Sequence, residues 1–70
     1  MTVHNKLKEL RHDHRMNQTE FAEFLGISVY SYNRYENGTR IPVLEVALQI
    51  SEKLKRPVND IFYRVNETSK

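Results

Sequence analysis

The two glycines of the chain, Gly26 and Gly38, each follow a short helix-like segment, and they constrain the fold more than any other feature. Asn17 stands three residues before Glu20, which is the spacing of a capping box, so a helix is expected to open at Gln18. Apolar residues then recur at helical spacing up to Gly26, and glycine is typical of the position just after a helix. The sequence therefore predicts a short helix that ends at the first glycine.

A second short helix is predicted between the two glycines. Ser28 is a favourable N-cap, and the segment that follows contains no glycine or proline before it ends near Asn37. Only about three residues separate this helix from the preceding one. Two helices joined by so short a turn form the helix-turn-helix arrangement, here over residues 18–37. In that arrangement the second helix enters the major groove of DNA and the first lies across the backbone.

Helical spacing of apolar residues predicts three more helices. One is expected from about Val3 to His14, one with Pro42 in its first turn and a break at residues 55–57, and a last one from about Val58 to Phe62. The residues after Phe62, Tyr63-Arg64-Val65-Asn66, alternate and are also compatible with a strand that pairs with Thr2-Val3-His4 in a small terminal ribbon. The second of the five predicted helices is expected to bury Phe21, Ala22 and Leu25. The apolar residues of the other three are Val3, Leu7 and Leu10, then Leu44, Ala47, Leu48, Ile50 and Leu54, and finally Ile61 and Phe62.

Length and composition restrict the class of function. Seventy residues are expected to form one domain, residues 1–70, that buries only about 60% of its unfolded surface and has little room for an enclosed catalytic pocket. The chain has no cysteine, which excludes disulfides and thiolate metal sites and fits a reducing cytoplasm. No apolar run approaches the ~20 residues of a membrane span, and no secretory signal stands at the start. We therefore expect a small helical binding module that is not an enzyme.

The three histidines do not form a metal-binding group. His12 and His14 are two positions apart on a predicted helix and point in different directions, and His4 is distant from both. Nothing in the sequence assembles serine, histidine and aspartate into a catalytic triad either. We expect neither a metal nor another cofactor.

A series of residues at fixed spacing extends over nearly the whole chain: Gln18, Phe21-Ala22, Gly26-Ile27, Glu36-Asn37-Gly38, Pro42, Leu44, Leu48, Ile50, Leu54 and Asp60-Ile61-Phe62. This series resembles the lambda-repressor/Cro-type (XRE-like) helix-turn-helix regulators. The resemblance implies an all-α, compact five-helix domain that binds double-stranded DNA. It also implies a cytoplasmic regulator of transcription, encoded by a bacterium, an archaeon or a phage.

The outward face of the second motif helix carries the candidate base-reading residues. Helical spacing turns Tyr32 and Tyr35 inward, which leaves the opposite face to the four candidates Val29, Tyr30, Asn33 and Arg34. Valine and tyrosine can pack on thymine methyl groups, and arginine can donate to O6 and N7 of guanine. Two alternatives stay open: Val29 and Tyr30 as ordinary surface or dimer residues, and Arg34 as a phosphate contact or a solvated charge.

The resemblance also implies a set of contacts to the DNA backbone. Gln18 opens a helix, where free N–H groups attract an anion. The full set of expected phosphate contacts is Gln18, Ser28, Asn37, Thr39 and Arg40. A helix-opening role alone for Gln18, a capping role alone for Ser28 and ordinary loop polarity for Thr39 remain alternatives.

The resemblance further implies a structural ion pair. Arg11 of the first helix and Glu36 at the end of the third match residues that pair in some family members. We expect a partly buried pair that positions the reading helix, with an uncompensated charge left behind if one partner is lost.

The modest formal net charge of +2 bears on the oligomeric state. Few phosphate contacts give weak binding, so useful specificity requires two copies on a pseudo-palindromic operator with half-sites about 34 Å apart. We therefore expect a homodimeric repressor, with an apolar interface formed by Ile61, Phe62, Tyr63 and Val65. The alternative, from another class, is an antitoxin or other protein-binding module that uses Phe24 and Tyr30 to contact a protein partner.

Overall fold

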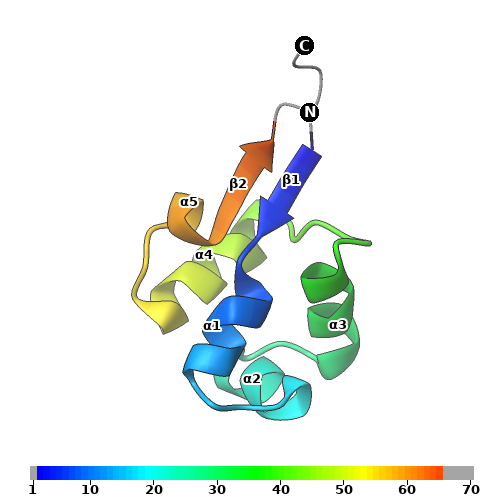
Figure 1. Ribbon diagram of the computed structural model, residues 1–70, viewed down its shortest axis with the longest axis vertical. Helices are drawn as coiled ribbons and strands as arrows, with labels where there is room; N and C mark the ends of the chain where they lie inside the picture. The colour runs from blue at the N-terminus through cyan, green and yellow to red at the C-terminus, as the bar shows by residue number, and fades with distance from the viewer. Residues whose placement is uncertain (1, 66–70) are drawn as a thin grey trace.

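The computed structural model describes residues 2–65, which form five helices and one two-stranded antiparallel sheet (Figure 1). In chain order the elements are β1 (Thr2–Asn5), α1 (Leu7–Asp13), α2 (Gln18–Leu25), α3 (Val29–Asn37), α4 (Leu44–Leu54), α5 (Val58–Ile61) and β2 (Phe62–Val65). The helices pack together, and the sheet extends from one end of the helical body (Figure 1). The predicted all-α, five-helix fold with a small terminal ribbon is confirmed.

The ribbon shortens the first predicted helix. β1 pairs antiparallel with β2 along its whole length, with Asn5 opposite Phe62. The backbone groups of residues 2–5 thus find partners on β2, whereas a helix would have required them for its own hydrogen bonds. The predicted helix start at Val3 is therefore wrong, and α1 begins at Leu7. The predicted strand residue Asn66 lies outside the described residues.

The ends of α2 and α3 follow the predicted capping chemistry. Asn17 and Glu20 form a complete capping box: the Asn17 side chain accepts from the backbone N–H of Glu20 at 2.8 Å, and the Glu20 carboxylate accepts from that of Asn17 at 2.9 Å. The Ser28 hydroxyl accepts from a backbone N–H in the first turn of α3 at 3.1 Å. Gly26 and Gly38 follow the two helices, each with φ of 80° in the left-handed region that favours glycine. Local chemistry thus fixes both helices of the motif.

The boundaries of the last two helices differ from the prediction. Val43 is extended, with ψ of 162°, so α4 begins at Leu44 and Pro42 precedes it instead of lying in its first turn. Phe62 is also extended and opens β2, so α5 ends at Ile61. Pairing with β1 supplies the backbone partners that end this helix.

The core lies between the helices and the inner end of the ribbon. On α4 the inward residues Ala47, Ile50 and Leu54 recur at spacings of three and four. Leu44 and Leu48 belong to the apolar repeat of this helix in the sequence, but they stand beside the buried line and are 72% and 46% exposed. The buried apolar residues are Leu7, Leu10, Phe21, Ala22, Leu25, Tyr32, Tyr35, Ala47, Ile50, Leu54, Ile61 and Phe62.

Candidate nucleic-acid interface

The inward face of α3 is held against the rest of the molecule by two tyrosines. Tyr32 is fully buried, and its ring meets the edge of Phe21 on α2 with the ring centroids 5.6 Å apart and the planes at 82°. Tyr35 is also buried, and its backbone carbonyl accepts from the side chain of Asn5 at 2.8 Å. Since both ends of this face are anchored, the orientation of α3 and the direction of its outward face are fixed.

The outward face of α3 presents the four expected base-reading residues. Val29 and Tyr30, in the first turn, are 39% and 64% exposed. The Asn33 side chain donates to the backbone carbonyl of Val29 at 3.1 Å. The Arg34 Nη2 atom donates to the hydroxyl of Tyr30 at 2.7 Å, and its Cζ atom lies 4.7 Å from the centroid of that ring. These residues therefore form one continuous surface on one side of the helix.

The Glu36 carboxylate joins three helices at the end of α3. Arg11 of α1 donates through Nε to Oε1 at 3.0 Å and through Nη2 to Oε2 at 3.2 Å, so the predicted ion pair is present. Gln18 of α2 donates to Oε2 at 3.2 Å, and the hydroxyl of Tyr32 donates to Oε1 at 2.5 Å. Arg11 also donates to the backbone carbonyl of Met16, in the loop between α1 and α2, at 3.2 Å. One carboxylate thus fixes the relative positions of α1, α2 and α3.

The hydrogen bonds of this cluster determine its charge state. Burial by itself raises the pKa of Glu36, but the hydrogen bonds from Arg11, Tyr32 and Gln18 outweigh burial and hold the pKa below its ordinary value of 4.5. Burial, followed by the hydrogen bond to Glu36, raises the pKa of Tyr32. The hydrogen bond to Glu36 also raises the pKa of Arg11. At neutral pH the cluster therefore consists of a carboxylate, a guanidinium and a neutral phenol.

The residues expected to contact phosphate lie at the start of α2, at the start of α3, and at or just after the end of α3. Gln18 is the first residue of α2, half-buried, with its amide nitrogen bonded to Glu36. The hydroxyl of Ser28 caps α3, and that of Thr39 donates to the carbonyl of Arg34 at 3.3 Å. Asn37 and Arg40 are exposed, at the end of α3 and in the loop after it. Their side chains are accessible, while the other three also have structural roles.

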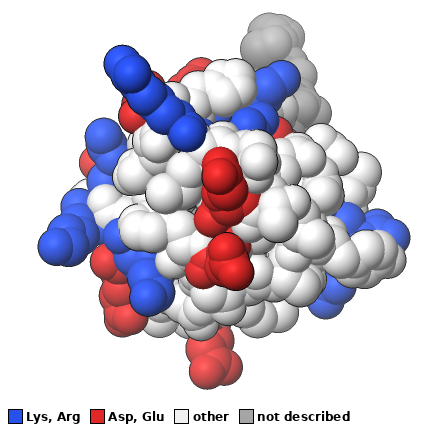
Figure 2. All heavy atoms as spheres, turned by 90° about the horizontal axis from the view of Figure 1, so that it is seen from below, with Lys and Arg blue, Asp and Glu red and all other residues white. Residues whose placement is uncertain are grey.

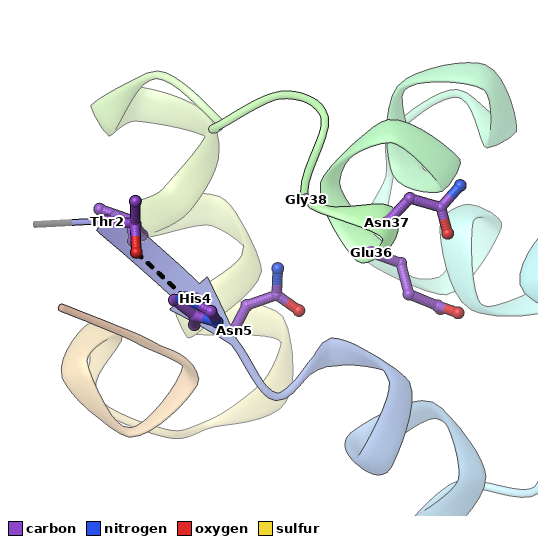
Figure 3. Close-up of a pocket in the computed structure, with 7 residues that line it drawn as sticks. Thr2, His4, Asn5, Glu36, Asn37 and Gly38 are labelled. Carbon is purple, nitrogen blue, oxygen red and sulfur yellow. Dashed lines mark hydrogen bonds between the residues drawn. The ribbon is translucent and has the colours of Figure 1, made fainter. Parts of the chain in front are cut away.

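A hollow of about 350 Å³ separates β1 from the C-terminal end of α3 (Figure 3). Residues 2–5 line one side and residues 36–38 the other. Asn5 reaches across to the last turn of α3, where it donates to a backbone carbonyl, and it also accepts from the backbone N–H of Leu7 at 3.0 Å. The hollow therefore holds a bracing contact that fixes the end of α3 relative to α1.

On the α2 face of the molecule, the charged side chains do not form one broad basic surface (Figure 2). Figure 2 views the molecule from the α2 side and shows acidic side chains in the middle of that face, with basic side chains mainly towards its edges. The exposed residues of α2 include Glu20 and Glu23. The middle of this face is therefore acidic.

Two other classes of site are not found in the described part of the chain. Within residues 2–65, no group of three histidine, cysteine, aspartate or glutamate residues could hold a metal ion. Across the same range, every helix is too short or too polar to cross a membrane.

Comparison with known proteins identifies the family. The model of a family described as helix-turn-helix matches residues 7–61, which include all five helices. The chain belongs to the helix-turn-helix family. This match confirms the resemblance to lambda-repressor/Cro-type regulators that the sequence motifs indicated. The two helices of the motif are α2 and α3.

The similar proteins include two kinds of regulator and an antitoxin. A Pyrococcus horikoshii protein whose name places it among HTH-type transcriptional regulatory proteins is 47% identical over 53 residues, which are 76% of this chain and 17% of that protein. Antitoxin PezA of Streptococcus pneumoniae is 39% identical over 59 residues, 84% of this chain and 37% of PezA. RstR, named as a transcriptional repressor of the cryptic phage CTXphi of Vibrio cholerae, is 28% identical over 64 residues, 91% of this chain and 57% of RstR. This helix-turn-helix chain thus spans less than two thirds of each of these relatives.

Two residues that support the helix-turn-helix motif were not predicted from the sequence. Gln49 of α4 donates to the backbone carbonyls of Leu25 and Gly26, at 2.9 and 3.2 Å, and so holds the turn between α2 and α3. A single glutamine on a predicted helix gives no sign of this contact. Asn5 gave no sign of its role either, because it falls inside the first helix predicted from the sequence, whereas in the structure it stands two residues before α1 and bonds to the N–H of Leu7.

Proposed function

We propose that this helix-turn-helix chain is a sequence-specific DNA-binding repressor that places α3 in the major groove. The observation that carries the proposal is the asymmetry of α3: its inward tyrosines are buried, while Tyr30, on the opposite side, is 64% exposed. A large exposed aromatic side chain beside Val29 in the first turn of this face is suited to contact base edges. The proposed activity is binding, without catalysis or a cofactor, in the cytoplasm of a prokaryotic cell.

The proposed base contacts follow from the chemistry of each side chain. Arg34 would donate to O6 and N7 of a guanine, and Val29 and Tyr30 would pack on thymine methyl groups. Asn33 donates an amide N–H to the helix backbone, and its side-chain oxygen would accept from N6 of adenine or N4 of cytosine. The four residues would read adjacent base pairs of one half-site.

The proposed backbone contacts lie at the ends of α2 and α3. Gln18 has a second amide hydrogen besides the one given to Glu36, and this hydrogen together with the N-terminus of α2 would bind a phosphate. The ion pair with Arg11 neutralises Glu36, which removes a repulsion that would otherwise oppose a phosphate beside Gln18. Further phosphate contacts are proposed for Ser28, Asn37, Thr39 and Arg40.

A homodimer on a pseudo-palindromic operator remains part of the proposal, with a revised interface. Ile61 has no exposed surface and Phe62 is 9% exposed, so neither can contribute the contact expected of it while the monomer stays folded. Of the four residues expected at this interface, Tyr63 and Val65 remain. A larger apolar surface lies where the chain enters α4, with the exposed side chains of Ile41, Val43, Leu44 and Leu48.

The experiment that tests DNA binding is selection of bound duplexes from a random pool, followed by a salt titration. We expect an enriched pseudo-palindrome and an affinity that falls as salt rises. Arg34→Ala should reduce discrimination at one base position by about 1–3 kcal/mol and leave the other positions unchanged. Enrichment of no sequence would overturn the proposed function, and unchanged discrimination in the variant would assign Arg34 to the backbone.

A second candidate function is that of an antitoxin. The observation that favours it is the 39% identity to Antitoxin PezA over 84% of this chain. Tyr30 would then contact a protein partner, together with the half-buried Phe24 on α2. A neighbouring toxin reading frame whose product co-purifies with this chain would support this function. The two candidate functions differ in what Tyr30 contacts. Tyr30→Ala should weaken the complex with the protein partner if the chain is an antitoxin, and it should alter base preference if the chain is a DNA-binding repressor.

A further inference from the structure

Two side chains on the outward face of α3 form a contact of their own. Tyr30 and Arg34 are four residues apart, which places them one above the other on the helix surface. The Arg34 Nη2 atom donates to the Tyr30 hydroxyl at 2.7 Å. The guanidinium carbon also lies 4.7 Å from the centre of the tyrosine ring, within the range of a cation–π contact.

The contact restrains an otherwise flexible side chain. Arginine loses much rotational freedom when it binds, and a side chain already held in place loses less. Arg34 is half-buried although it stands on the outer face, and the exposed ring of Tyr30 is its contact there. The free protein therefore already holds the guanidinium over the first turn of α3.

The hydrogen bond leaves the guanidinium able to read a base. A guanidinium carries five N–H donors, and the Tyr30 hydroxyl uses one of them. The remaining donors still include an adjacent pair that fits O6 and N7 of guanine. Because an arginine fork matches guanine only in one plane, a contact that fixes this plane also fixes which base is preferred.

We propose that Tyr30 is a specificity-determining residue that acts through Arg34, by holding its guanidinium in the plane that recognises guanine. The inference rests on the proposed DNA-binding function. It changes the role of Tyr30, which acts as a positioning residue for Arg34 in addition to contacting DNA itself. The hydroxyl and the ring contribute separately, so their effects can be measured separately.

The first test uses the free protein and does not depend on DNA. Ring current from Tyr30 should shift the NMR resonances of the Arg34 Hδ and Hε protons upfield. The shift should persist in Tyr30→Phe, which keeps the ring, and disappear in Tyr30→Ala. Identical Arg34 resonances in the wild type and Tyr30→Ala would show that the contact is absent and would overturn the inference. Tyr30 is 64% exposed, so neither variant is expected to unfold the protein.

The second test is a double-mutant cycle on the selected duplex and its single-base variants. Tyr30→Phe should lower the preference for guanine at the Arg34 position by roughly three- to tenfold, as expected for one lost hydrogen bond. Tyr30→Ala should lower it by roughly two- to fivefold more, as expected for a lost cation–π contact. The same changes in an Arg34→Ala background should have no effect at that position.

The outcomes separate the inference from the function on which it rests. Additive effects of the Tyr30 and Arg34 changes, or an equal loss of affinity for every duplex, would overturn the inference while DNA binding stood. If the wild type selects no sequence, the proposed function fails, and the inference fails with it. Base positions read by Val29 and Asn33 serve as controls within the same titrations, because a merely structural effect of Tyr30→Phe would change them too.

Discussion

At the scale of single residues, Glu36 is the centre of a hydrogen-bonded cluster in the candidate interface. Its two oxygens accept four hydrogen bonds, two from Arg11 and one each from Gln18 and Tyr32. The carboxylate side chain is 5% exposed, so few of these bonds could be replaced by water. Loss of one donor therefore leaves a buried charge with incomplete compensation.

Arg11→Ala should destabilise the fold by about 3 kcal/mol, at the lower end of the range for breaking a buried ion pair. The lower end is expected because Tyr32 and Gln18 still donate to Glu36 and because the Arg11 side chain keeps 13% of its surface exposed. Urea denaturation of the two proteins measures the difference. Lys8→Ala, on the exposed side of α1, is the control and should change stability by less than about 0.5 kcal/mol. Denaturation curves of Arg11→Ala and the wild type that superimpose would show that the pair has no structural role.

The lowered pKa of Glu36 predicts a specific loss of stability in acid. The unfolded state has the ordinary value of 4.5 and the folded state a lower one, so the carboxylate stabilises the fold above pH 4.5. This contribution is lost as the pH falls below 4.5 and through the folded value. In Glu36→Gln it is absent at every pH. The difference in unfolding free energy between the wild type and Glu36→Gln should therefore be largest near neutral pH and should narrow in acid. Parallel stability curves from pH 3 to pH 7 would contradict the assignment.

At the scale of the elements, comparing alanine substitutions at the two glycines measures how much the contact at the turn between α2 and α3 contributes to stability. Gly26 and Gly38 have the same φ of 80°, and an alanine at either position meets the cost of the left-handed region, about 1–2 kcal/mol. Their surroundings differ. A Cβ at Gly38 meets no atom within 4 Å, whereas a Cβ at Gly26 would lie 2.8 Å from the amide nitrogen of Gln49. That nitrogen donates to the backbone carbonyls of Leu25 and Gly26. Displacing it therefore breaks the hydrogen bonds that hold α4 to the turn.

Gly26→Ala should therefore lower the free energy of unfolding by about 1 kcal/mol more than Gly38→Ala does. This difference is the net contribution of a typical hydrogen bond. Thermal or urea unfolding of both variants gives the difference directly. In a Gln49→Ala background the two alanine variants should become equal, because the atom in the way is gone. If the two alanine variants still differ in unfolding free energy in the Gln49→Ala background, the explanation by crowding at the turn is wrong.

The elements whose ends depend on local chemistry were the ones predictable from the sequence. The capping box at Asn17, the Ser28 cap and the two glycines each act within a few residues, and both motif helices have the expected bounds. The starts of α1 and α4 were misplaced. The first depends on pairing with β2 more than fifty residues away in the chain, and the second on the extended conformation of Val43. Prediction therefore succeeds where a capping side chain marks the start of a helix, as Asn17 and Ser28 do, and it fails for α1 and α4, whose starts have no side-chain cap.

The same distinction applies to the candidate site. The side of α3 that faces outward was predictable, because Tyr32 and Tyr35 are turned inward by helical periodicity alone. The Arg11–Glu36 pair was reached through the family resemblance. The bonds from Asn5 to Tyr35 and from Gln49 to the turn bring together residues 30 and about 24 positions apart, and no pattern in the sequence indicates them.

At the scale of the whole molecule, the modest net charge and the exposed apolar residues both favour the proposed dimer as the functional unit. The net charge is only +2, and acidic side chains stand in the middle of the α2 face (Figure 2). One copy would therefore bind weakly, and two copies on adjacent half-sites would bind more tightly because their contacts add. The exposed apolar side chains of Ile41, Val43, Leu44 and Leu48, 46–72% exposed, are available to join them, and none of the four belongs to the proposed base-reading residues of α3.

Leu48→Glu should convert the proposed dimer into a monomer, because it places a charge in an interface whose stability would come from apolar burial. Leu48 is 46% exposed in the single chain, so the fold itself should tolerate the change. Sedimentation equilibrium gives the association state. Titration of duplexes with one and two half-sites gives the consequence for DNA: binding to two half-sites should weaken at least tenfold, while binding to a single half-site should stay the same.

The matched variant is Tyr63→Glu, in the tail that the sequence first indicated as the interface. The Tyr63 side chain is 39% exposed and its ring lies 5.9 Å from the ammonium group of Lys6, so a glutamate there keeps a cation nearby and should not open the ribbon. We expect this variant to remain a dimer, because the tail offers two apolar side chains against four at the start of α4. Dissociation by Tyr63→Glu but not by Leu48→Glu would return the interface to the tail. A wild type that sediments as a monomer and binds one and two half-sites with equal affinity per site would overturn the dimer altogether.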